Sequence, residues 1–126
     1  MLTILVIEDS PVNMALTVAI LENAGHAVLQ AEHALQGLDI ASAERPDLIL
    51  MDIQLPDIDG LTATRMLKSS LRTAHIPVIA LTAFAMESDE ADTRAAGCDG
   101  HVTKPIRYKE FLSEMETVLK QRGELA

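Results

Sequence analysis

Five side chains of chemically useful type each follow a short apolar segment of the chain: Glu8, Asp9, Asp52, Thr82 and Lys104. Three carboxylates held together without a cation repel one another, so a cluster of this kind favours a bound positive charge. Mg²⁺ takes oxygen ligands and needs only one or two protein carboxylates when it keeps several waters. With Mg²⁺ and Lys104 neutralising charge, Asp52 is able to attack a phosphoryl group and form an aspartyl phosphate, to which Thr82 would donate a hydrogen bond.

Alternating strand and helix patterns are expected to position these residues. Short, apolar, β-branched runs predict strands at residues 2–7, 27–31, 47–52, 77–81 and 100–104. Helical spacing of apolar residues covers residues 11–24, 35–45, 63–71, 86–96 and 108–119. Five successive β-then-α units predict an α/β fold, a doubly wound five-stranded parallel sheet with five helices. In such folds ligands bind outside the carboxyl ends of the strands, which is where the five side chains would converge.

The same patterns predict which side of each helix is buried. In the first helix, with Ser10 as its N-cap, the predicted buried stripe is Val12, Ala15, Leu16, Ala19 and Ile20. The third helix is expected to bury Leu71, and the last helix is expected to bury Tyr108. Asp57 and Asp59 are predicted to be turn and capping residues before the third helix.

Composition limits the function classes. The 126 residues, 13.6 kDa, predict one domain without internal repeats or linkers. A formal net charge of −9 disfavours binding to nucleic acids or anionic membranes. The single cysteine, Cys98, excludes an intramolecular disulfide, and the first apolar run is too short for a signal peptide or a membrane span. A cytoplasmic protein is predicted.

The motifs around the five side chains resemble those of the receiver domain of two-component response regulators. The matching pieces are Glu8-Asp9, Met51-Asp52, Leu81-Thr82-Ala83, Lys104-Pro105 and the loop Leu55-Pro56-Asp57-Ile58-Asp59-Gly60. The resemblance spans essentially the whole chain, and residues 51–56 and 81–86 are similar to bacterial receivers. It implies a flavodoxin-like, CheY-like sheet with strand order 2-1-3-4-5.

The resemblance also implies a role for each site residue. Asp52 would be the phosphoacceptor and a Mg²⁺ ligand, Asp9 a direct Mg²⁺ ligand, Glu8 a ligand through water, and Gln54 a ligand through its backbone carbonyl. Thr82 and the amide of Ala83 would hold phosphoryl oxygens. Lys104 would pair with a further oxygen and precede a cis bond to Pro105. The implied activity is self-phosphotransfer and autodephosphorylation at Asp52, so the chain would not be an enzyme in the usual sense.

A switch and two kinds of partner are implied as well. The phosphoryl donor would be a histidine kinase or a histidine phosphotransfer protein. Thr82 would then switch the surface formed by the fourth helix, fifth strand and fifth helix, to control binding of a downstream protein target. Receivers commonly carry Tyr or Phe three residues before the lysine, where this chain has His101. Residues 1–126 would form a stand-alone receiver without an output domain, a monomer or weak dimer.

Other functions share part of this pattern. A haloacid-dehalogenase-type phosphatase needs an acid two residues after its nucleophile, where this chain has Gln54. A flavodoxin-like flavin binder would place its phosphate beside Glu8 and Asp9, which would repel it. Two alternatives stay open at the level of the sequence: an unphosphorylated pseudo-receiver that acts as a docking module, and the receiver fragment of a hybrid histidine kinase.

Overall fold

The computed structural model describes residues 1–82, 87–104 and 106–121 of the chain. Along these residues the strands and helices alternate in the order β1 (Thr3–Ile7), α1 (Pro11–Asn23), β2 (Ala27–Ala31), α2 (Ala34–Glu44), β3 (Leu48–Asp52), α3 (Gly60–Ser69), β4 (Val78–Thr82), α4 (Glu87–Ala96), β5 (Gly100–Thr103) and α5 (Tyr108–Gln121). All strand pairs are parallel, in the order β2-β1-β3-β4-β5. The predicted fold and strand order are confirmed, and the strand ends agree to within one residue.

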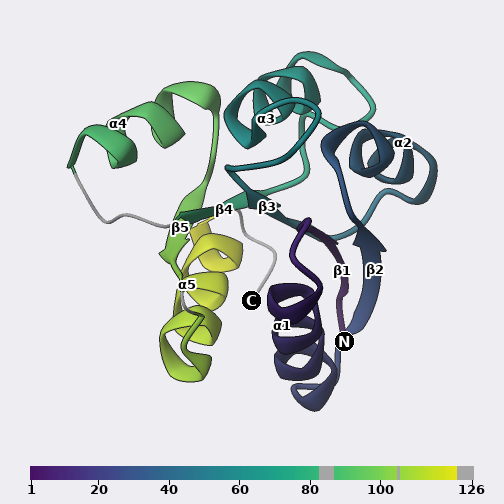
Figure 1. Cartoon of the computed structure of the whole chain (residues 1–126), viewed down its shortest axis with the longest axis vertical. Coiled ribbons are helices and arrows are strands. Elements are labelled where there is room, and N and C mark those ends of the chain that lie inside the picture. Colours follow the sequence, from purple (N-terminus) through teal and green to yellow (C-terminus); the bar gives the residue numbers. More distant parts are fainter. Residues whose placement is uncertain (83–86, 105, 122–126) are drawn as a thin grey trace.

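Helices cover both faces of the sheet (Figure 1). α1 and α5 lie on one face, and α2, α3 and α4 lie on the other. Alternate residues of β1 supply the two cores, with Ile4 and Val6 in the cluster beneath α1 and α5, and Leu5 and Ile7 in the cluster beneath α2 and α3. Because both faces of each central strand are buried, the strands read as continuous apolar runs rather than alternating ones.

The register of the strands determines which side chains meet at the carboxyl edge of the sheet. Ile7 of β1 lies opposite Met51 of β3, so the next residues, Glu8 and Asp52, emerge side by side. After β1 the chain continues to β2 at one edge of the sheet, whereas after β3 it continues to β4, towards the opposite edge. The strand order therefore reverses between β1 and β3. A ligand crevice is expected at this reversal of strand order.

The predicted buried face of α1 is wrong except at Ile20, which is buried as predicted. Val12 and Leu16 are 77% and 43% exposed, whereas Met14, Ile20 and Leu21 point into the core. The helix is apolar nearly all round, so the spacing of apolar residues could not distinguish its buried side from its exposed side. The predicted N-cap is confirmed, because the Ser10 hydroxyl accepts a hydrogen bond from the Asn13 amide at 3.3 Å.

Leu71 and Tyr108, which were also predicted to be buried, are exposed. Leu71 is 98% exposed because α3 ends at Ser69, and the Thr73 hydroxyl donates to the Leu67 carbonyl at 2.7 Å, which satisfies one of the last carbonyls of the helix. Tyr108 is 52% exposed at the first position of α5. Over the described parts of the chain, no helix combines the length and the apolar composition that a membrane span requires.

Candidate functional site

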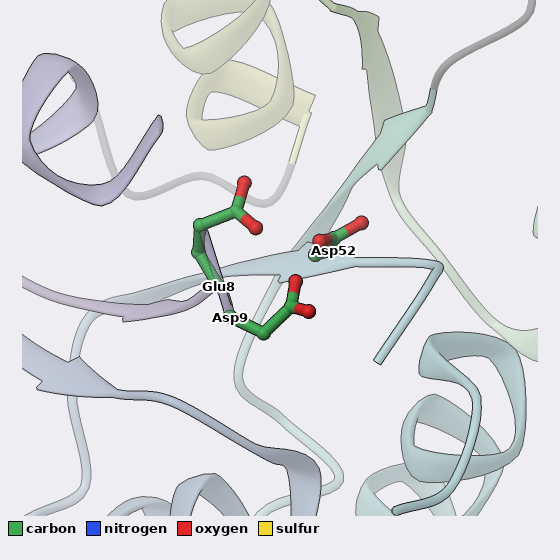
Figure 2. Close-up of side chains that lie close together, drawn as sticks. All are labelled: Glu8, Asp9 and Asp52. Carbon is green, nitrogen blue, oxygen red and sulfur yellow. The ribbon is translucent and has the colours of Figure 1, made fainter. Parts of the chain in front are cut away.

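Three carboxylates converge at the carboxyl edge of the sheet (Figure 2). Glu8 and Asp9 follow β1 and Asp52 ends β3, and one oxygen from each lies within 4.8 Å of the others. Glu8 and Asp52 are 1% and 2% exposed, whereas Asp9 is exposed to solvent. Burial of two adjacent carboxylates is costly unless a positive charge compensates it.

Lys104 supplies part of that compensation. Its Nζ lies 3.0 Å from Glu8 Oε1 and 3.1 Å from Asp52 Oδ2, just beyond the end of β5. Glu8 Oε1 is fully buried and, despite this ion pair, has no hydrogen bond of good geometry from the described residues. One ammonium cannot neutralise three carboxylates, so the site retains an excess of negative charge that a divalent cation would balance.

The pKa values of the two buried partners shift in a way that keeps a charged lysine in the site. Burial raises the pKa of Glu8, and the neighbouring Asp52 carboxyl raises it further, against the opposing effects of Lys104 and of the Ser10 amide, which lies 3.2 Å from Glu8 Oε2. Burial alone would lower the pKa of Lys104, but its contacts with Glu8 and Asp52 outweigh burial, and the net shift is upward. Lys104 is therefore a stable cation beside the Asp52 carboxylate at neutral pH.

The loop after β3 holds Asp52 in position. The Gln54 amide donates a hydrogen bond to Asp52 Oδ1 at 3.0 Å, and the Ile53 amide donates to the Leu81 carbonyl at 3.2 Å. A Cβ atom on Gly60 would collide with the carbonyl oxygen of Asp52, so this close return of the chain requires glycine. The Asp52 side chain therefore presents Oδ1 to the loop and Oδ2 to Lys104.

Thr82 and Lys104 are brought together by the pairing of β4 and β5. The Lys104 amide donates a hydrogen bond to the Thr82 carbonyl at 2.6 Å, and Thr82 is 5% exposed. His101 lies on β5 opposite Ala80 and is half-buried. The predicted roles of Ala83 and of a cis bond to Pro105 fall on residues outside the described part of the chain.

This arrangement suits a hard cation and a carboxylate nucleophile. Glu8 and Asp9 line a hollow of about 440 Å³ that continues along α1 and β2 past Met14, Val18 and Gln30. Exposed Asp9 and buried Asp52 both offer oxygen ligands of the kind Mg²⁺ prefers, and Asp9 lies at the hollow. The geometry thus fits metal-assisted transfer of a phosphoryl group.

Comparison with known protein families decides the class. The sequence model of the response regulator receiver domain family matches residues 4–116. The chain belongs to this family. Receiver domains are phosphoryl-accepting modules of two-component signalling, so the function class predicted from the motifs is confirmed.

Curated relatives of the receiver include bacterial response regulators. It is 42% identical over 93% of its length to the polar-differentiation response regulator DivK of Brucella anthropi, of which it covers 95%, and 41% identical to DivK of Brucella ovis over the same shares. Among solved structures, the receiver domain of a sensor histidine kinase from Pseudomonas aeruginosa shares 33% identity and a TM-score of 0.84, with 97% and 98% of the two chains covered. That structure has a magnesium ion coordinated in its active site cleft.

The fold is shared more widely. A putative response regulator from Chloroflexus aurantiacus gives a TM-score of 0.90 at 25% identity, covering 94% of the receiver and 98% of its own chain. The chemotaxis protein CheY4 of Vibrio cholerae gives 0.89 at 24% identity, with 94% and 99% covered, which supports the CheY-like fold alone.

Asp57 and Asp59, predicted as turn and capping residues before the third helix, have different roles. Asp59 Oδ1 accepts a hydrogen bond from the Thr62 amide at 2.9 Å and caps α3 of the receiver, as predicted. Asp57 instead accepts hydrogen bonds from the Ala34 and Leu35 amides at the start of α2. These residues precede Asp57 by 23 and 22 positions in the sequence. A weak signal was present in the sequence, since the residue before α2 is His33, a poor N-cap whose side chain makes no capping hydrogen bond.

Proposed function

We propose that this receiver accepts a phosphoryl group on Asp52 in a Mg²⁺-dependent reaction. The observation that carries the proposal is that Asp52 is buried, lies 3.1 Å from the Lys104 ammonium, and forms a cluster with two further acids. An aspartate with only a structural role would gain nothing from additional negative charge around it.

The metal would be held mainly by Asp9 and Asp52. Asp9 is exposed and close enough to share a cation with Asp52, while the backbone carbonyl of Gln54 would supply a third protein oxygen. Glu8 is buried and already paired with Lys104 at 3.0 Å, so its contribution would pass through a water molecule. Bound Mg²⁺ would neutralise charge on the transferring phosphoryl group.

In the reaction, one oxygen of the Asp52 carboxylate forms a bond to phosphorus as the phosphorus–nitrogen bond of a phosphohistidine donor breaks. The imidazole nitrogen of the donor leaves with the bonding electron pair. Lys104 would pair with one phosphoryl oxygen, and the Thr82 hydroxyl and the Ala83 amide would bind the others. The donor would be a histidine kinase or a histidine phosphotransfer protein, and both partners would meet the receiver in the cytoplasm.

The output surface would be formed by α4, β5 and α5. A hollow of about 460 Å³ lies across these elements, lined by Arg94, His101 and Glu114 among others. Thr82 at the end of β4 neighbours β5, so its movement towards a phosphoryl group would reach His101 through the β4–β5 pairing. Phosphorylation would thereby control binding of a downstream protein target by a receiver that is monomeric or weakly dimeric.

Intact mass spectrometry after incubation with a small acyl phosphate and Mg²⁺ tests this proposal. The wild-type chain should gain one phosphoryl adduct, which Asp52→Asn and removal of Mg²⁺ by EDTA should abolish. Asp39→Asn is the matched control, because Asp39 is an exposed aspartate on α2 that does not belong to the acid cluster. An adduct that survives in Asp52→Asn would assign the phosphoacceptor to another residue.

Two alternatives predict different outcomes. If the chain is an unphosphorylated docking module, no adduct forms even with a phosphorylated histidine donor, and Asp52→Asn leaves partner binding unchanged. The 33% identity to a receiver of a sensor histidine kinase favours a second candidate, a receiver that passes its phosphoryl group on within a relay. Rapid transfer from phosphorylated Asp52 to a histidine phosphotransfer protein would support that candidate.

A further inference from the structure

The loop between β3 and α3 connects the phosphoacceptor to a distant helix. At its start, the Gln54 amide bonds to Asp52 Oδ1 at 3.0 Å, and the Gly60 amide at its end bonds back to the Ile53 carbonyl at 2.7 Å. Between these points the loop turns towards α2, and its half-buried Leu55 and Ile58 pack against the core on that side of the sheet. The position of Gln54 therefore depends on how the middle of the loop is held.

Asp57 makes the polar tether in the middle of this loop. Its Oδ1 accepts from the Ala34 amide at 2.9 Å and its Oδ2 accepts from the Leu35 amide at 2.8 Å. These amides are the first two of α2, where unpaired N–H groups and the helix dipole both attract a carboxylate. The same hydrogen bonds hold the pKa of Asp57 down at about 2, so both oxygens accept at neutral pH.

If α2 needed only an N-terminal cap, a residue directly before the helix could supply it, and a carboxylate from a distant loop would not be required. Asp59, in the same loop, caps its own helix through the Thr62 amide three positions later, and Ser10 caps α1 in the same local way. α2 has His33 at its N-cap position and no acid in its first turn, so the capping carboxylate comes from the loop that carries Gln54. The hydrogen bonds of Asp57 stabilise two segments at once, the start of α2 and the conformation of the loop.

We propose that Asp57 is a positioning residue for the phosphoryl and Mg²⁺ site, which fixes the loop beside Asp52 by anchoring it to the first turn of α2. This inference rests on the proposed function, because it assigns to Gln54 a carbonyl contact with the metal. Since coupling between two events is reciprocal, filling the site should strengthen the capping of α2, and loosening the cap should weaken metal binding. Residues that orient metal ligands typically affect metal affinity without touching the metal.

The test compares Asp57→Ala with Ala43→Gly. Ala43 is an exposed residue near the end of α2, and glycine there lowers helix stability without a contact to the loop. Calorimetric titration should show that Asp57→Ala raises the Mg²⁺ dissociation constant by about tenfold. Ala43→Gly, which also lowers the melting temperature, should leave that constant unchanged. At saturating Mg²⁺, acyl phosphate should still phosphorylate Asp52 in both variants.

Hydrogen exchange supplies a readout that a purely structural role would not change. In the wild type, protection of the Ala34 and Leu35 amides should rise when Mg²⁺ and a phosphoryl mimic are added. Asp57→Ala should abolish this rise, and Asp57→Asn, which keeps one acceptor oxygen, should retain part of it. Should Asp57→Ala fail to fold, Asp57→Asn carries both measurements.

The outcomes separate the two proposals. A wild-type receiver that is phosphorylated, combined with an unchanged Mg²⁺ dissociation constant in the Asp57 variants, would overturn this inference and leave the proposed function standing. A wild-type chain that neither binds Mg²⁺ nor accepts a phosphoryl group would overturn both. Equal weakening of Mg²⁺ binding by Ala43→Gly would reduce Asp57 to a residue that only stabilises α2.

Discussion

Lys104 shows how a single side chain can make a site both stable and reactive. It is the cation that the described residues place between two carboxylates buried to 1% and 2% exposure. Removing one partner of a buried ionic group costs more than the pair itself contributes, because the remaining charge stays buried and unpaired. The residue proposed to bind a phosphoryl oxygen therefore also stabilises the buried carboxylates of the site.

Lys104→Met should lower the free energy of unfolding by about 3 kcal/mol at neutral pH, because Glu8 and Asp52 remain buried without their ammonium. Urea unfolding followed by circular dichroism measures this change. Lys120→Met is the matched control, since Lys120 pairs with Glu116 at 2.9 Å but is 62% exposed, and should cost less than about 1 kcal/mol. Equal costs for the two substitutions would contradict the assigned role of Lys104.

The lowered pKa of Asp57 predicts how the stability of the protein depends on pH. Its pKa falls from 3.8 to about 2 on folding, chiefly because the Leu35 amide donates to the carboxylate. A group with a lowered folded-state pKa stabilises the protein above its unfolded pKa, and this stabilisation is lost as the pH falls through the folded one. The wild type should melt at a higher temperature than Asp57→Asn. This difference in melting temperature should be constant above about pH 5 and should become smaller between about pH 4 and pH 2. A difference that does not change over this range would disprove the capping role.

Among the elements of the fold, the bounds of the strands could be predicted from the sequence, but the buried side of each helix could be predicted only in part. β1 and β3 are short apolar runs bounded by charged or turn residues, so their ends, and hence the positions of Glu8 and Asp52, follow from the sequence. α1 has no comparable contrast between its sides, and its orientation is decided by packing that is not local. The tether from Asp57 to α2 was missed for the same reason, because its partners are distant in the chain.

The corrected orientation of α1 can be tested with two leucines of the same helix. Leu21 is fully buried and Leu16 is 43% exposed, so the same substitution should have unequal effects. Leu21→Ala should cost about 2–5 kcal/mol of unfolding free energy, through lost burial and a cavity. Leu16→Ala should cost about 1 kcal/mol or less. Denaturant unfolding of both variants measures the costs, and a larger cost at Leu16 would restore the orientation predicted from the sequence.

For the whole molecule, the site exists only when the sheet is assembled. Asp9 and Asp52 come from different strands, and the pairing of Ile7 with Met51 is what brings them within reach of one ion. An unfolded chain offers scattered carboxylates with little affinity for Mg²⁺, so binding of the ion to the folded state adds to its stability. Binding of a metal at this site would therefore be linked to folding through the strand order.

This linkage predicts that Mg²⁺ stabilises the chain against urea. Above the dissociation constant, each tenfold rise in free Mg²⁺ should add about 1.4 kcal/mol to the unfolding free energy. The net charge of −9 means that any salt also reduces repulsion, so NaCl at matched ionic strength is the necessary comparison. Asp9→Asn should relieve repulsion and leave the metal-free protein at least as stable, yet lose most of the response to Mg²⁺. If Asp9→Asn responds to Mg²⁺ as strongly as the wild type, the ion acts by screening, and Asp9 is not a ligand.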